Sequence, residues 1–140
     1  MTVASIEELC AGFCEIVQQP APPLAAGDDG TTAFNLEWRG VTVDVMHLPH
    51  RSRDHLFILL DMGPIEREGI APARIMQALL EANFFSLRAV PLAFGRHPLS
   101  GAAVLQRALT LDFASPTALL ETIEEGVDLA LQWREDAFLT

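Results

Sequence analysis

One segment, residues 72–83, restricts the possible folds of this chain more than any other. Its residue spacing predicts a helix, with Pro72 in the first turn and Asn83 at the end. The polar side chains of this helix form one narrow stripe, which consists of Arg74, Gln77 and Glu81. Apolar side chains cover the rest of its circumference, and they are Ile75, Met76, Ala78, Leu79, Leu80 and Ala82. Such a helix must be buried from two sides. Because 140 residues make a single domain, we expect a second subunit to cover one side.

Five segments have the residue pattern of β-strands, and they are residues 34–38, 41–45, 55–62, 87–95 and 102–113. The first two alternate apolar and polar residues around a turn at Arg39-Gly40. The third is almost continuously apolar, as in a strand covered on both faces. The last two predict a hairpin. In its second strand Arg107 falls on the apolar face, which predicts either a bulge or an arginine whose head group reaches solvent.

Two more helices flank the strands. One is predicted from residue 5 to about residue 18, and Ser115 with Pro116 begins the other. The proline-rich stretch 18–32 is typical of an exposed connector. The element order is therefore α-β-β-β-α-β-β-α. It predicts an α+β fold in which a twisted antiparallel sheet packs against helices, in one domain spanning residues 1–140.

The charge of the chain limits its partners. The net charge is −10, and all nine basic residues are arginines. An acidic surface repels phosphate backbones and anionic lipids, so we expect no nucleic-acid or membrane partner. Without lysine, the chain lacks a phosphate-binding P-loop lysine and a Schiff-base lysine. We therefore expect no cofactor and no ATP-driven step carried out by this chain.

The sequence does not predict a segment for membrane insertion or secretion. No apolar run approaches the roughly 18 residues needed to cross a bilayer. The first ten residues carry two glutamates and no basic residue, unlike a signal peptide. We expect a cytoplasmic protein.

Three histidines, His47, His50 and His55, lie within nine residues and are accompanied by Asp54. Such a cluster can bind zinc, which would permit a metal-dependent hydrolase. The spacing matches no standard zinc signature, and the segment is typical of a solvated loop between strands. We therefore expect no metal site and no enzymatic activity, with the hydrolase as the least favoured alternative.

Five pieces of the sequence carry a more specific signal. They are FNLEWRGVTVDV (34–45), LFILLDMG (56–63), QALLEANFF (77–85), AFG-x-x-P-L-S-G-x-x-V-L (93–105) and a tryptophan near the end of the last helix, Trp133. With these pieces in order, and with its length and acidity, the chain resembles class I type III secretion chaperones, the Tir chaperone or CesT-like family. The resemblance covers roughly residues 5–134.

The resemblance implies a homodimer, in the bacterial cytoplasm, that forms through the 72–83 helix and the 87–95 strand. It also implies binding of the N-terminal chaperone-binding segment of a secreted effector in extended form. Such binding needs no ATP and keeps the effector soluble and competent for export. A secretion ATPase is a further partner that the family suggests. Because Pro91 cannot donate to a strand ladder, we expect dimer pairing along the 87–95 strand to be offset.

The groove for the partner is expected on the first helix and the early strands. Its candidate residues are Phe13, Val17, Leu36, Trp38, Val43 and Val45. The candidates for the dimer interface are Ile75, Leu79, Leu92 and Phe94. For each of these residues the alternative is an ordinary place in the core. An adaptor or scaffold dimer of the same fold, acting outside secretion, remains an alternative function.

Overall fold

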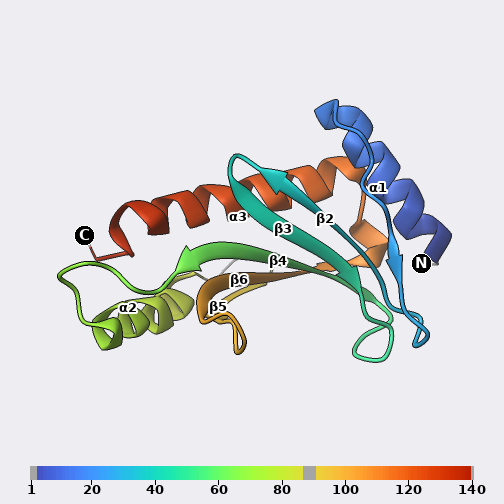
Figure 1. Ribbon diagram of the computed structural model, residues 1–140. Coiled ribbons are helices and arrows are strands. Elements are labelled where there is room, and N and C mark those ends of the chain that lie inside the picture. The colour runs from blue at the N-terminus through green and yellow to red at the C-terminus, as the bar shows by residue number, and fades with distance from the viewer. Residues whose placement is uncertain (1–2, 87–90, 140) are drawn as a thin grey trace.

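The computed structural model describes residues 3–86 and 91–139 and shows helices packed around one sheet (Figure 1). The elements, in chain order, are α1 (Val3–Val17), β1 (Ala25–Ala26), β2 (Thr32–Trp38), β3 (Val41–His47), β4 (His55–Pro64), α2 (Pro72–Phe85), β5 (Leu92–Arg96), β6 (Ala102–Thr110), the short 3-10 helix η1 (Leu111–Phe113) and α3 (Pro116–Asp136). The strands lie in the order β1-β2-β3-β4-β6-β5, with antiparallel neighbours throughout. The predicted α+β fold is confirmed. No helix in the described part of the chain is long and apolar enough to span a membrane.

One face of the sheet holds the core. Its buried strand residues alternate along the central strands and include Val41, Val43, Val45, Leu56, Ile58 and Leu60. In Figure 1, α3 (red) runs along this face, α1 (blue) lies near the N-terminal end of α3, and α2 (green) lies near β5. Trp133, near the end of α3, is also buried. The alternation in the first two predicted strands therefore arises because helices cover only one face of the sheet. The prediction that residues 55–62 are covered on both faces is wrong, because Phe57 and Leu59 are only half-buried on the opposite face.

The hairpin between β2 and β3 has a two-residue turn. Arg39 and Gly40 both have positive φ, at 53° and 79°, and Trp38 pairs with Val41 across the turn. Positive φ at both central residues gives a turn whose twist matches that of the two strands. The predicted strands 34–38 and 41–45 therefore pair as expected.

The connector expected at residues 18–32 contains a short strand. In β1, Ala25 and Ala26 pair with Ala33 and Thr32 of β2, and Thr32 is buried at the start of β2. The sheet thus has six strands in the described residues rather than the five predicted. A strand of two residues has no periodicity that the sequence could reveal.

The second predicted hairpin has different bounds. β5 begins at Leu92, so Pro91 precedes the strand, and residues 87–90 of the predicted strand lie outside the described residues. β6 ends at Thr110, and the last three residues of the predicted 102–113 strand form η1. The predicted 72–83 helix is α2, which continues to Phe85 and so passes the expected end at Asn83.

Both sequence-based explanations of Arg107 are wrong. β6 is regular at this residue, which pairs with Ile58, and the bulge lies instead in β4 between Asp61 and Gly63. The Arg107 side chain does not reach solvent, because the residue is only 3% exposed. Its guanidinium donates to the Glu125 carboxylate on α3 at 2.5 Å. An ionised partner from the covering helix is what allows a buried arginine on this face.

Two arginines hold the C-terminal end of α3 against the sheet. Arg134 donates to the carbonyl oxygens of Met62 at 2.8 Å, Gly40 at 3.0 Å and Asp61 at 3.3 Å. The Arg67 guanidinium lies 4.5 Å from the ring centre of Trp133, over its face. The end of α3 is thereby joined to the β2–β3 turn and to the bulge of β4.

Candidate interaction surfaces

The first candidate surface lies between α1 and β2. Trp38 packs on Phe13, with 6.4 Å between ring centres, and Val17 follows Phe13 by one helical turn on the same side of α1. Phe13 has no exposed surface, Val17 and Trp38 are half-buried, and the neighbouring Ile16 is 48% exposed. Leu36 is half-buried and lies on the same side of β2 as Trp38. We call Ile16, Val17, Leu36 and Trp38 the α1–β2 patch.

The six predicted partner-binding residues fall into two groups. Val17, Leu36 and Trp38 present apolar surface in the α1–β2 patch. Phe13, Val43 and Val45 have no exposed surface and belong to the core under the helices, so a partner cannot touch them in this structure. Apolar character alone does not separate the two groups. The spacing of Ile16 also fits the core stripe of α1, so its exposure has no signal in the sequence pattern.

The α1–β2 patch adjoins an open strand edge. In a two-residue hairpin the residues beside the turn exchange hydrogen bonds, so Trp38 faces β3, whereas Glu37 and Asn35 face away from it. β1 pairs no farther along β2 than Ala33. Among the described residues, no backbone group pairs with the outward N–H and C=O groups of Asn35 and Glu37. We call these groups the β2 edge.

The second candidate surface lies on α2. Leu80, Phe84 and Phe85 are 65%, 77% and 79% exposed, and the two phenylalanine rings meet edge to face with 5.2 Å between centres. We call these three residues the α2 stripe. Leu80 and Phe84 are four residues apart, so they lie on one side of the helix. Three large exposed side chains together are unusual for a surface that only meets water.

The predicted dimer-interface residues lie mostly inside the protomer. Ile75, Leu79 and Phe94 are 0%, 2% and 5% exposed, and Leu92 is half-buried. The prediction that α2 has more apolar surface than one chain covers agrees with the α2 stripe. The predicted interface residues Ile75 and Leu79 are not part of the α2 stripe. Periodicity alone shows that two faces of the helix are apolar, but it does not show which of them the sheet covers.

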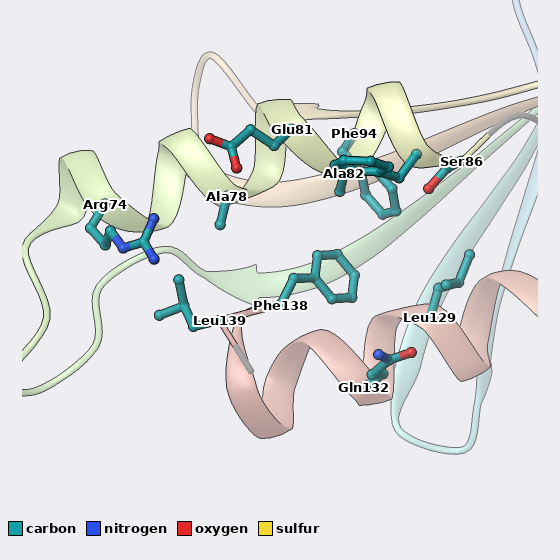
Figure 2. A pocket seen from close by; sticks show the side chains of 11 residues that line it. Arg74, Ala78, Glu81, Ala82, Ser86, Phe94, Leu129, Gln132, Phe138 and Leu139 are labelled. Atoms are coloured by element: carbon teal, nitrogen blue, oxygen red, sulfur yellow. The ribbon is translucent and has the colours of Figure 1, made fainter.

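A groove of about 330 Å³ lies between α2 and α3 (Figure 2). Phe94 and Phe138 lie in it with 5.4 Å between ring centres. Ala137 and Phe138 have positive φ, at 52° and 60°, and this turn lets the chain return toward α2 after α3 ends. Phe85 of the α2 stripe also lines the groove, so the groove and the stripe adjoin each other.

The sheet face opposite the helices is partly apolar. Met46, Phe57 and Leu59 are half-buried there and line a cavity of about 220 Å³. On the same face, burial and the nearby Asp61 carboxylate raise the pKa of Asp44. This face combines apolar side chains with one partly desolvated acid, Asp44.

The three clustered histidines of the sequence do not converge on one point in the structure. His47 is buried on the helix-covered face, and its Nε2 lies 3.2 Å from the Arg53 carbonyl oxygen. His55 lies on the opposite face, since its position alternates with the buried residues of β4, and its Nδ1 lies 2.8 Å from the Ser52 hydroxyl. His50 lies 3.7 Å from Asp29. No group of metal-binding side chains gathers anywhere in residues 3–86 and 91–139.

Solved structures of similar fold support this architecture. The chain is similar to a chain in the crystal structure of the ExsC–ExsE complex, with a TM-score of 0.74, 19% identity, and coverage of 98% of this chain and 97% of that one. It is similar to a chain of the HopA1–SchA chaperone–effector complex, with a TM-score of 0.63, 15% identity and 93% coverage of both chains. It is also similar to a chain of the ExoT–SpcS complex from Pseudomonas aeruginosa, with a TM-score of 0.58, 19% identity, and coverage of 89% and 92%.

No curated protein matches this chain by sequence. The sequence pattern of one protein family does match, over residues 9–134, and that family is described as the Tir chaperone protein (CesT) family. The match includes α1 from Leu9 onward, the whole sheet, α2 and nearly all of α3. The resemblance seen in the sequence is thereby confirmed, and this chain belongs to the Tir chaperone protein (CesT) family.

Proposed function

We propose that this chain is a type III secretion chaperone that binds the N-terminal segment of a secreted effector in extended form. The family supports this function, as does the similarity of the fold to a chain from a chaperone–effector complex. Binding takes place in the cytoplasm, before export. It uses no ATP, and release falls to the secretion machinery, where a secretion ATPase is the natural partner.

The β2 edge beside the α1–β2 patch is the observation that carries this proposal. An extended peptide can add to a sheet edge with its backbone hydrogen bonds while alternate side chains enter apolar pockets. The outward N–H and C=O groups of Asn35 and Glu37 can make the backbone hydrogen bonds of such a site. The apolar surface comes from half-buried or exposed side chains, which are Ile16, Val17 and Trp38.

Recognition of an extended segment requires a large surface. Ordering a disordered chain costs about 2–5 kcal/mol, and such interfaces bury about 1,000–3,000 Å². One α1–β2 patch consists of four side chains, which are too few to bury this area alone. A homodimer carries two patches, which a single effector chain can occupy in succession. We therefore include dimerisation in the proposal, with the α2 stripe as the contact between the two copies.

The test begins with the protein that co-purifies with this chain from its native host, identified by mass spectrometry. Fragments of that protein are then titrated against the purified chaperone. We expect the N-terminal ~100 residues, the span that the family resemblance implies, to bind as tightly as the whole protein, since recognition of an extended segment needs no folded effector domain. Tight binding that needs only a later, folded domain would favour the adaptor alternative and contradict the proposal.

A pair of variants locates the site. Ile16→Asp places a charge in the α1–β2 patch at a position that is already 48% exposed, so the chain should still fold. We expect it to weaken binding of the N-terminal fragment by about tenfold or more, the equivalent of roughly 1.4 kcal/mol. Leu99→Asp is the control, because Leu99 is 92% exposed in the β5–β6 loop, away from the patch. Equal affinities for the two variants would show that the α1–β2 patch does not bind the effector.

A further inference from the structure

The sheet has a second edge, at β5, which is the last strand in the sheet order. A strand at an edge presents unpaired N–H and C=O groups to which another strand can add. Phe94 is the middle residue of β5 (Leu92–Arg96). Whether this edge accepts a strand depends on what surrounds the peptide groups of Phe94.

The peptide groups of Phe94 point away from β6. The Ala108 N–H donates to the Pro91 carbonyl at 3.4 Å, and the His97 N–H donates to the Ala102 carbonyl at 2.8 Å. In an antiparallel pair, residues alternate between facing the partner strand and facing away from it. Because Pro91 and His97 face β6, Phe94, which lies three residues from each of them, faces outward.

The Asn83 side chain, from α2, occupies that outward position. Its Oδ1 accepts a hydrogen bond from the Phe94 N–H at 2.6 Å, and its Nδ2 donates to the Phe94 carbonyl oxygen at 3.2 Å. A carboxamide has the same donor and acceptor as a peptide group. Asn83 therefore makes both bonds that a neighbouring strand would make, and it stands where that strand would lie.

We propose that Asn83 is a specificity-determining residue that closes the β5 edge to strand addition. An extended partner can then pair with free peptide groups at the β2 edge. A second copy of the chain contacts the β5 side of the molecule through side chains of α2, and the two sheets do not join. The proposal that the β5 edge is closed depends only on the contacts of Asn83. The binding of an effector at the β2 edge rests on the proposed function.

The experiment compares wild type with Asn83→Ala, using the purified chain without any effector. In dilute solution, we expect the Phe94 amide of the variant to exchange with deuterium about tenfold faster or more, because removal of the carboxamide takes away its hydrogen-bond acceptor. At high concentration, sedimentation velocity should show the variant at about twice the mass of wild type, because the opened β5 edges pair with each other. Failure of the effector-binding proposal would change neither result.

Two further variants make the result specific. Gln77→Ala removes a carboxamide from the same helix, where its partner is Glu81 at 3.0 Å rather than β5, and it should behave as wild type in both measurements. Asn83→Asp leaves a charge at the edge, which opposes strand pairing, so its mass should stay that of wild type. If Asn83→Ala does not fold, Asn83→Ser, whose hydroxyl is too short to bridge Phe94, replaces it with the same expectations. Unchanged Phe94 exchange, or a folded variant with the wild-type mass, would overturn the proposal.

Discussion

Two aspartates on the open face of the sheet show how single residues affect the stability of this protein. Asp44 of β3 is paired with Leu59 of β4, and Asp61 lies two residues farther along β4, on the same face. Burial, and then the Asp61 charge, raise the pKa of the Asp44 carboxyl above its ordinary value of 3.8. The folded chain therefore holds this proton more tightly than the unfolded chain does.

The first prediction concerns pH. A carboxyl whose pKa is raised in the folded state contributes stability below its ordinary pKa, and that contribution is lost as the pH rises through the folded value. At pH 7 the ionised Asp44 thus costs free energy of folding. We expect Asp44→Asn to raise the midpoint of urea denaturation at about pH 7, and the gain to disappear at about pH 3. Asp112→Asn, at an exposed position, is the control and should produce no such difference. An equal gain for Asp44→Asn at both pH values would contradict the assignment.

Arg107 shows what the sequence can and cannot predict about a residue. Its position among apolar residues of the strand is unusual for an arginine, and in the structure the residue is indeed buried. The explanation lies in Glu125, which is 18 residues away in another element. Alternation within a strand reports which face a residue occupies, but it carries no information about the helix that later covers that face.

At the scale of whole elements, the position of α3 depends on its C-terminal turn. Arg134 reaches three carbonyl oxygens, those of Met62, Gly40 and Asp61. Gly40 belongs to the β2–β3 turn and Asp61 to the bulge of β4. One side chain thus joins the end of a helix to two irregular points of the sheet.

The second prediction follows from these bonds. Arg134→Ala removes a charged donor from three carbonyl groups, and hydrogen bonds to charged groups contribute about 1.5–3 kcal/mol when well shielded from water. Because Arg134 is exposed, we expect a smaller total loss, of about 1–3 kcal/mol in the free energy of unfolding. Urea denaturation measures this loss. Arg51→Ala, which removes an exposed arginine from the β3–β4 loop, should change stability much less, and similar losses in the two variants would contradict this role of Arg134.

The elements themselves were largely predictable. Alternation located β2 and β3, helical periodicity located the three long helices, and an almost continuous apolar run located β4. The short elements β1 and η1 escaped detection, since two or three residues hold no period. The α2 faces were also ambiguous. Ile75 with Leu79, and Leu80 with Phe84, are equally good apolar pairs at a spacing of four, and only packing against the sheet separates the buried pair from the exposed one.

At the scale of the whole molecule, the two candidate interaction surfaces lie apart from each other. β2, which carries part of the α1–β2 patch, lies near one edge of the sheet, and α2, which carries the α2 stripe, lies beside β5 at the other edge (Figure 1). Their separation allows one surface to join two copies while the other stays free for an effector. In this proposed arrangement a homodimer presents two separate binding sites.

The third prediction tests the contact between copies. Phe84→Asp places a carboxylate in the α2 stripe, and burying an unpaired charge at an interface costs several kcal/mol. We expect wild type to sediment as a dimer at about 10 µM and the variant as a monomer, since a loss of 4.1 kcal/mol is a factor of about a thousand in the dissociation constant. Phe113→Asp is a matched control, because Phe113 is also 77% exposed but lies on η1. A Phe84→Asp variant that remains a dimer would rule out the α2 stripe as the contact.

The positions of the two tryptophans have a practical consequence. The chain has two tryptophans and no tyrosine, so its near-ultraviolet fluorescence comes from two indoles in different settings. Trp133 is 1% exposed beneath the Arg67 guanidinium, whereas Trp38 is half-buried where α1 meets β2. We expect a ligand that binds over Trp38 to cover the part of this ring that is still exposed and to move its emission to shorter wavelength, whereas the emission of the buried Trp133 should change less. A shift of the tryptophan emission would therefore report binding at the proposed site without an added label.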